Sequence, residues 1–316
     1  MKLIFPIAAL AIGMMLSTLP ADAANKKTIG VSIPAATHGW TGGINWHAQQ
    51  AKAALEKKYP DLSIAIVTAG SASRQANDLE DLVSARKIDA LVILPFESGP
   101  MTEPVRQVKA AGKWVTVVDR GLTDPAIQDL YVAGNNPQMG ANSANYVKDK
   151  LGGKGNIVVL RGMPTVIDNQ RFDAFMDIIK TSDIKVLDSK YANWNRDDGF
   201  KVMQDFLARF PKIDAVWAQD DDITLGVIEA VKQAGREKQM FILGGAGMKE
   251  MIKRVMDKDT LVPADVLYPP TMIAQAMELT AQKLMENADI KKEYIVDATL
   301  VTPENAKQYY YPDSPF

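Results

Sequence analysis

The chain has 316 residues, carries a formal net charge of −2 at pH 7 and contains no cysteine. The near-neutral charge gives no electrostatic reason to expect a nucleic acid or an anionic membrane as partner. Without cysteine, the chain can form no disulfide, carry no thiol nucleophile or cysteine metal ligand, and receive no lipid on a cysteine at a cleavage site. The length suits about two domains of ordinary size.

Residues 1–23 have the pattern of an export signal. Lys2 precedes an apolar run from Leu3 to Leu19, and Ala21-Asp22-Ala23 then forms a small-x-small cleavage site. A membrane anchor is the alternative, but the run is short for a spanning helix and is interrupted by proline and glycine. An exported protein without an anchor would diffuse away from a cell that has no outer membrane, so the periplasm is the natural compartment. We therefore expect cleavage after Ala23 and a periplasmic protein.

Beyond the signal, short apolar runs alternate with amphipathic segments, a pattern typical of βα units and parallel sheets. In the first half, the expected strands are Ile29–Ile33, Ser63–Thr68, Ala90–Leu94, Trp114–Val118 and Leu130–Ala133. In the second half, they are Asn156–Leu160, Ile184–Leu187, Ala215–Ala218, Met240–Gly244 and Val262–Val266. Two successive sets of five strands predict an α/β fold with two similar lobes, each a doubly wound parallel sheet. Gly134-Asn135-Asn136-Pro137 combines turn formers with a proline and marks the first crossing between them.

Helices are expected between the strands, for example over Ile44–Tyr59, where apolar residues recur at helical spacing. Asp197 or Asp198 is expected to cap a helix over Gly199–Arg209, since a short carboxylate can accept from the free amides of a first turn. By the same reasoning, Asp221 or Asp222 is expected to cap the helix over Ile223–Lys232.

Aromatic and hydrogen-bonding side chains follow successive strands, at the ends where open parallel sheets bind ligands. The residues expected to contact a ligand there are His38, Trp40, Thr41, Asp119, Arg120, Arg171, Trp194 and Asp220. Indole rings stack on the C–H faces of a sugar or polyol, and charged groups can bridge neighbouring hydroxyls. For each of these residues, a purely structural role is the alternative. The tryptophans could be packing residues, Asp119 and Arg120 a local ion pair, and Arg171 a solvated surface group.

Motifs of enzyme sites are incomplete. Gly244-Gly245-Ala246-Gly247 does not continue as a dinucleotide-binding loop, because Glu250 occupies the last glycine position. The only histidines, His38 and His47, lack the spacing of a helical zinc pair. Adjacent carboxylates at residues 220–222 point in different directions, which disfavours a cation site. We expect no catalysis, no cofactor and no metal.

The chain resembles the type I periplasmic sugar-binding proteins, the ribose-binding-protein-like receptors of ABC importers. The resemblance covers the whole mature chain. It is carried most specifically by Val117-Val118-Asp119-Arg120, by Arg171 with Phe175, by Ala192-Asn193-Trp194-Asn195 and by the run Ala215 to Asp221. It implies that His38, Trp40, Asp119 and Arg120 contact the ligand from the N-terminal lobe. It likewise implies that Arg171, Trp194 and Asp220 do so from the C-terminal lobe.

The resemblance also implies a three-strand hinge near Asn135, Ala264–Leu267 and Lys291–Tyr294. The N-terminal lobe would then comprise residues 24–135 and 267–292, and the C-terminal lobe residues 136–266 and 293–316. Three positions depart from the family pattern: Ala246 replaces an aspartate, Asp220 replaces an asparagine, and Tyr268 puts a phenol where a glutamine is common. Tyr268 is therefore expected to contact the ligand, and a smaller, deoxy or less hydroxylated ligand than ribose is plausible.

These observations predict a monomeric receptor that closes over a sugar or polyol and delivers it to an inner-membrane ABC permease. A sensor of the same solute, read by a chemoreceptor or sensor kinase, is the first alternative. A periplasmic sugar-modifying enzyme is the second, and it is disfavoured because no nucleophile–base pair is evident. The ligand domain of a cytoplasmic repressor is opposed by the export signal.

Overall fold

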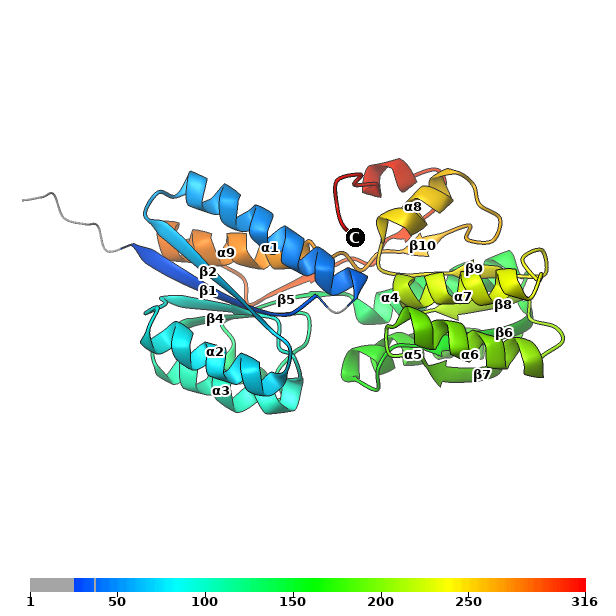
Figure 1. Ribbon diagram of the computed structural model, residues 1–316, viewed down its shortest axis with the longest axis horizontal. Coiled ribbons are helices and arrows are strands. Elements are labelled where there is room, and N and C mark those ends of the chain that lie inside the picture. Colours follow the sequence, from blue (N-terminus) through cyan, green and yellow to red (C-terminus); the bar gives the residue numbers. More distant parts are fainter. Residues whose placement is uncertain (1–25, 37) are drawn as a thin grey trace, which may run out of the picture.

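Two parallel sheets organise residues 26–36 and 38–316, the part of the chain that this computed structural model describes. Each sheet is the centre of one lobe, and the two lobes lie side by side (Figure 1). The α/β fold class with two doubly wound lobes is confirmed. The expected export signal lies outside the described residues. Within the described ranges, no helix combines the length and hydropathy needed to cross a bilayer.

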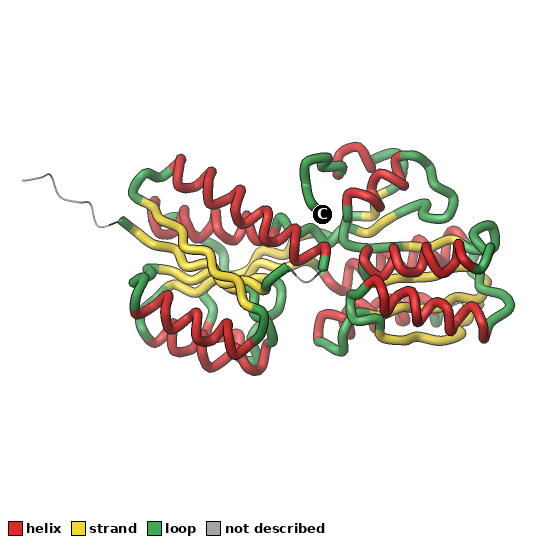
Figure 2. Tube along the Cα trace, viewed as in Figure 1, coloured by secondary structure: helices red, strands yellow, loops and turns green. Residues whose placement is uncertain are grey.

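The first lobe is built on a six-stranded parallel sheet in the order β11-β5-β4-β3-β1-β2. Its strands are β1 (Lys27–Pro34), β2 (Leu62–Ala69), β3 (Ala90–Ile93), β4 (Trp114–Val118), β5 (Leu130–Gly134) and β11 (Glu293–Val296). Its helices are α1 (Gly39–Lys58), α2 (Ala72–Ser84), α3 (Ser98–Ala110), α9 (Met272–Glu286) and the short 3₁₀ helix η1 (Pro125–Ile127). Helices α1 and α9 cover one face of the sheet and α2 and α3 the other, which Figure 2 shows as yellow strands between red helices.

The second lobe is built on a four-stranded parallel sheet in the order β7-β6-β8-β9. Its strands are β6 (Lys154–Arg161), β7 (Asp183–Tyr191), β8 (Ala215–Ala218) and β9 (Phe241–Leu243). Its helices are α4 (Asn136–Lys150), α5 (Val166–Ile179), α6 (Arg196–Arg209), α7 (Asp221–Gln233) and α8 (Lys249–Met256). Helix α4 packs on α5, and α6 packs on α7. Two short strands, β10 (Asp265–Val266) and β12 (Leu300–Val301), pair antiparallel, and the 3₁₀ helix η2 (Ala306–Tyr309) follows them.

Two central strands, β3 in the first sheet and β8 in the second, are buried at every position. A strand covered by helices on both faces needs apolar side chains on both, so it has a continuous apolar run instead of an alternating pattern. This is why the sequence places these strands well. The expected strand Val262–Val266 is only partly formed. Ala264 makes a single parallel bridge to Leu243, and only Asp265 and Val266 form a strand, with β12 as partner.

The chain passes between the lobes at three places. The first crossing lies between Gly134, the last residue of β5, and Asn136, the first of α4. The second joins β10 to α9. The third follows Val296, and here the expected boundary at residues 292 and 293 is wrong. Residues 293–296 form β11, which pairs in parallel with β5 and so extends the sheet of the first lobe.

Candidate ligand-binding site between the lobes

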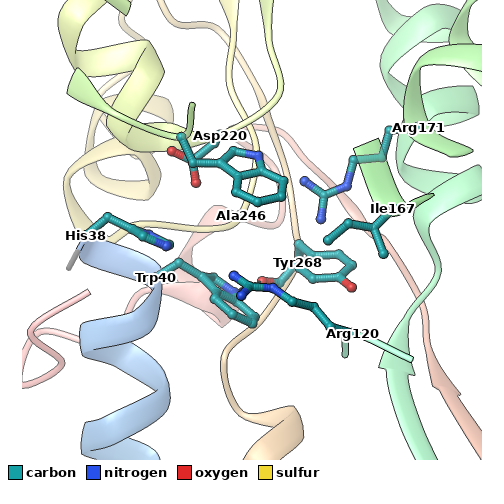
Figure 3. Close-up of a pocket in the computed structure, with 9 residues that line it drawn as sticks. His38, Trp40, Arg120, Ile167, Arg171, Asp220, Ala246 and Tyr268 are labelled. Carbon is teal, nitrogen blue, oxygen red and sulfur yellow. Dashed lines mark hydrogen bonds between the residues drawn. The ribbon is translucent and has the colours of Figure 1, made fainter. Parts of the chain in front are cut away.

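A cavity lies between the lobes, lined by residues that follow strands of both sheets (Figure 3). Its lining residues are His38, Trp40, Arg120, Ile167, Arg171, Trp194, Asp220, Ala246 and Tyr268. Seven of these are among the nine site residues expected from the sequence, and the exceptions are Ile167 and Ala246. The carboxyl ends of parallel strands in both lobes therefore converge on one cavity, as the topology of open α/β sheets requires.

The start of α1 supplies the first pair of lining residues. His38 precedes the helix, and its backbone amide donates to the Thr41 hydroxyl, which in turn donates to the His38 carbonyl. Thr41 thus holds the loop, and it faces an adjoining hollow instead of the central cavity. Burial and the positive charge of Arg120 lower the pKa of His38 to about 4, so its imidazole is neutral at pH 7. The Trp40 indole N–H donates to the carbonyl of Tyr268 at 2.9 Å.

Tyr268 connects the charged residues of the two lobes. Its hydroxyl donates to Asp119 Oδ1 at 2.5 Å and accepts from the Asn136 amide at 3.3 Å. Arg171 donates through Nε to Asn136 Oδ1 at 2.7 Å, and its guanidinium carbon lies 4.3 Å from the centre of the Tyr268 ring. Asp119 is not among the residues that line the cavity, and it is tied to the site through the Tyr268 hydroxyl. Arg171 is buried, so the plain alternative of a solvated surface group is wrong.

Arg120 and Trp194 also line the cavity. Arg120 donates from Nη1 to the Phe96 carbonyl at 2.7 Å, and its guanidinium carbon lies 6.0 Å from the Trp194 ring. Trp194 is held against the backbone of Gly162, where an added Cβ would lie only 2.0 Å from the indole nitrogen. Gly162 is therefore the residue that makes room for the indole.

The three carboxylates at residues 220–222 point to three different partners. Asp220 caps α7 and accepts from the amides of Asp222 and Ile223, so the expectation that Asp221 or Asp222 is the cap is wrong. Asp221 accepts from the amides of residues 245, 247 and 248, and Asp222 accepts from Gly39 in the other lobe. Asn195, not Asp197 or Asp198, caps α6 in the same way. In both helices the cap lies one to three residues earlier than expected, because the helix begins earlier.

Burial and the charge of Asp222 raise the pKa of Asp220 to about 8. The side chain is therefore largely protonated at pH 7, and its carboxyl group can donate as well as accept. A ligand hydroxyl accepts and donates in the same way. Asp220 in this position is suited to an uncharged polyhydroxy ligand.

Backbone strain concentrates around the cavity. Asp119, Asn193, Trp194 and Ala246 all have positive φ, at 59°, 54°, 50° and 116°. Residues other than glycine rarely adopt this conformation, and it persists only where surrounding contacts hold it. Ala246, for example, donates to Val266 O and accepts from Tyr268 N. The strain fixes the directions of the side chains that line or support the cavity.

Two lining side chains carry buried polar atoms that have no hydrogen-bond partner among the described residues: His38 Nδ1 and Trp194 Nε1. Arg120 Nε makes no hydrogen bond there either, but it lies 4.0 Å from Asp119 Oδ2, so the local ion pair that the sequence left open is present. Buried polar groups are usually paired, and an unpaired one carries a desolvation cost. The presence of His38 Nδ1 and Trp194 Nε1 at one cavity indicates a ligand with hydrogen-bonding groups. Within the described ranges, no group of three or more histidine and acidic side chains is arranged to hold a metal ion.

Sequence reasoning missed two residues with structural roles here. Ile167 lies one helical turn before Arg171 on α5, and this spacing is the signal that could have found it. Asn136 positions both Arg171 and Tyr268, but in the sequence it is indistinguishable from a turn residue at the first crossing.

Residues 29–289 match the periplasmic binding protein domain family, and the chain belongs to that family. A curated relative is the ribose import binding protein of Bacillus subtilis strain 168, which is 28% identical over 86% of this chain and 87% of its own length. The xylitol-binding protein of Mycolicibacterium smegmatis is 30% identical over 74% of this chain and 66% of its own length. Among solved structures, the fructose-binding periplasmic domain of a hybrid two-component system superposes with a TM-score of 0.79. It is 30% identical and covers 89% of this chain and 92% of that structure.

Proposed function

We propose that this chain is a periplasmic substrate-binding protein that captures a sugar or polyol between its lobes and delivers it to an ABC import permease in the inner membrane. The observation that carries the proposal is the shared cavity, whose lining residues come from both lobes. A ligand held by both lobes stabilises their closed arrangement, because some of its contacts exist only there. In this proposal the protein acts as a monomer.

The chemistry of the lining favours a polyhydroxy ligand. Trp40 and Trp194 offer aromatic surfaces, and Arg120, Arg171 and Asp220 offer charged or polar hydrogen-bonding groups. This combination can bind C–H faces and hydroxyls at once. The relatives named for ribose import and for xylitol binding support the same class of ligand.

We infer that the chain is a binding protein and no enzyme. Among the described residues that line the cavity, none is a serine, threonine or cysteine that could act as a nucleophile beside His38. Positioned hydrogen-bond donors and acceptors without such a group provide affinity for an intact ligand.

A sensory role for the same binding event is the second candidate. The similarity to the periplasmic domain of a hybrid two-component system favours it. Deletion of the gene separates the two roles. Loss of ligand uptake supports transport, whereas normal uptake with a lost transcriptional or chemotactic response supports signalling.

The experiment that tests binding is a thermal-shift screen of the purified protein against sugars and polyols, with amino acids as the matched control set. A ligand at about 100 times its dissociation constant stabilises by about 2.7 kcal/mol, a readily measured shift. Small-angle scattering with the best ligand then reports closure as a smaller radius. Stabilisation by amino acids alone, or by no sugar or polyol, would overturn the proposal.

A further inference from the structure

We propose that Tyr268 limits the size of the ligand, so that the cavity prefers polyols and sugars smaller than a hexopyranose. This inference rests on the proposed function and makes it more specific. It concerns one residue of the second crossing, which contributes both a wall of the cavity and a link between the charged groups of the two lobes.

The backbone of Tyr268 is fixed from two sides. Its amide donates to the Ala246 carbonyl at 3.2 Å, and its carbonyl accepts from the Trp40 indole at 2.9 Å. The preceding Leu267 makes a parallel bridge to Ala246 and donates to the Thr299 carbonyl. The residue therefore cannot move away from the cavity without breaking contacts of both lobes.

The side chain of Tyr268 is equally constrained. Its ring occupies the space beside Gly134, where an added Cβ would lie 2.1 Å from a ring carbon. Its hydroxyl is bonded to Asp119 and Asn136, and the Arg171 guanidinium lies against its ring. Rotation of the ring would leave the buried Asp119 carboxylate without its phenol partner, which is costly. Tyr268 is thus a rigid wall.

This wall reduces both the volume and the hydrogen bonds available to a ligand. The ring of Tyr268 is part of the cavity lining, so the space that it fills is closed to a ligand. Asp119 Oδ1 already accepts a hydrogen bond from the Tyr268 phenol. Arg171 already donates from Nε to Asn136 and from Nη1 to the Gln219 carbonyl. A ligand can use only the remaining atoms of these groups. A smaller or less hydroxylated ligand is satisfied by them, whereas a hexopyranose would leave hydroxyls buried without partners.

Isothermal titration with erythritol, D-ribose, xylitol and D-glucose tests the proposal on the wild-type protein. We expect D-glucose to bind at least tenfold more weakly than the best of the smaller ligands. Equal affinities would overturn the inference about Tyr268 while leaving the proposed function intact. Failure of every sugar and polyol to bind would instead overturn the proposed function, and this inference with it.

Two substitutions separate the size of the ring from its hydroxyl. Tyr268→Gln keeps a polar group near Asp119 but removes the ring, and we expect the ratio between the affinities for the best small ligand and for D-glucose to fall at least threefold. Tyr268→Phe keeps the ring and loses the hydroxyl, so affinities should fall for all ligands while the ratio stays unchanged. Thermal denaturation monitors the folding of both variants. Two results would show that ring size is not the determinant. One is a folded Tyr268→Gln protein with an unchanged affinity ratio. The other is a Tyr268→Phe protein that has lost the preference for the small ligand over D-glucose.

Discussion

Asp222 accepts a hydrogen bond from the backbone amide of Gly39 at 2.8 Å, and the two residues belong to different lobes. Gly39 is the first residue of α1, whereas Asp222 lies in the first turn of α7. A free amide at a helix start attracts a negative charge, so the second lobe provides a carboxylate for a helix of the first. An added Cβ on Gly39 would lie 2.8 Å from that carboxylate oxygen, which explains the glycine. Because this hydrogen bond spans the cleft, it requires closed lobes.

Asp222→Ala is expected to weaken ligand binding by roughly tenfold, since a hydrogen bond to a charged group contributes about 1.5–3 kcal/mol and about 1.4 kcal/mol is a factor of ten. The free energy of unfolding should change little, because Asp220 and not Asp222 caps α7. Titration calorimetry measures the loss of affinity. Small-angle scattering at subsaturating ligand measures the smaller fraction of closed molecules. Asp177→Ala, which removes an exposed carboxylate on α5, is the control. Unchanged affinity in Asp222→Ala would contradict a role in closure.

Gly162→Ala tests the position of the Trp194 indole without altering any cavity-lining side chain. The added Cβ would overlap the indole ring, so the ring must move. We expect ligand affinity to fall by at least tenfold, and the change in tryptophan fluorescence at saturating ligand to become smaller, with Trp40 still contributing. Gly99→Ala, where an added Cβ meets no atom within 4 Å, is the matched control at the cleft. A folded Gly162→Ala protein with wild-type affinity would show that Trp194 is a packing residue.

Asp220 combines a structural role with an expected ligand contact, and two substitutions distinguish them. Asp220→Ala should cost about 1 kcal/mol of stability by removing the cap of α7, and it should weaken binding at least tenfold. Asp220→Asn can still accept from the amides of Asp222 and Ile223, so its stability should stay near that of the wild type. It also keeps an uncharged donor and acceptor toward the ligand, and its affinity should stay within a few-fold. Denaturation curves and calorimetry on both variants provide the measurements. Equal binding losses in the two variants would indicate that the ligand needs a carboxylate at this position.

The sequence predicts the lobes and most of the cavity because both depend on strand ends. Continuous apolar runs locate strands such as β3 and β8, and the residues that follow such runs meet at one edge of a sheet. The residue at which a helix begins cannot be predicted in this way. Three consecutive aspartates at 220–222 are equally good caps in the sequence, and only the tertiary positions of Gly39 and the 245–248 loop decide which carboxylate points where. The place of β11 in the first sheet is likewise decided by pairing with β5, a contact between distant segments.

Two buried carboxyl groups lie beneath the loop that carries Ala246. Asp221 accepts hydrogen bonds from the amides of Gly245, Gly247 and Met248 at 3.0, 3.0 and 2.7 Å. Asp265, in β10, is fully buried, and neither of its carboxylate oxygens has a hydrogen-bond partner among the described residues. Burial raises the pKa of Asp265 to about 7, and burial together with the charge of Asp265 raises the pKa of Asp221 well above its ordinary value. Two such groups side by side favour a protonated state for at least one of them.

Asp265→Asn is expected to stabilise the protein at pH 8 and to have much less effect near pH 4. In the unfolded chain Asp265 loses its proton near the ordinary pKa of 3.8, whereas in the folded protein it holds the proton up to about pH 7. The folded state therefore binds more protons between these values, and stability falls as the pH rises through this window. Asparagine removes the titration, so the stability difference between the variant and the wild type should grow in favour of the variant as the pH rises from 5 to 8. Chemical denaturation of wild type, Asp265→Asn and the exposed-site control Asp177→Asn at pH 4, 5, 6, 7 and 8 measures the difference. A variant that is equally destabilised at every pH would show that Asp265 contributes a fixed structural contact and that its ionisation does not oppose folding.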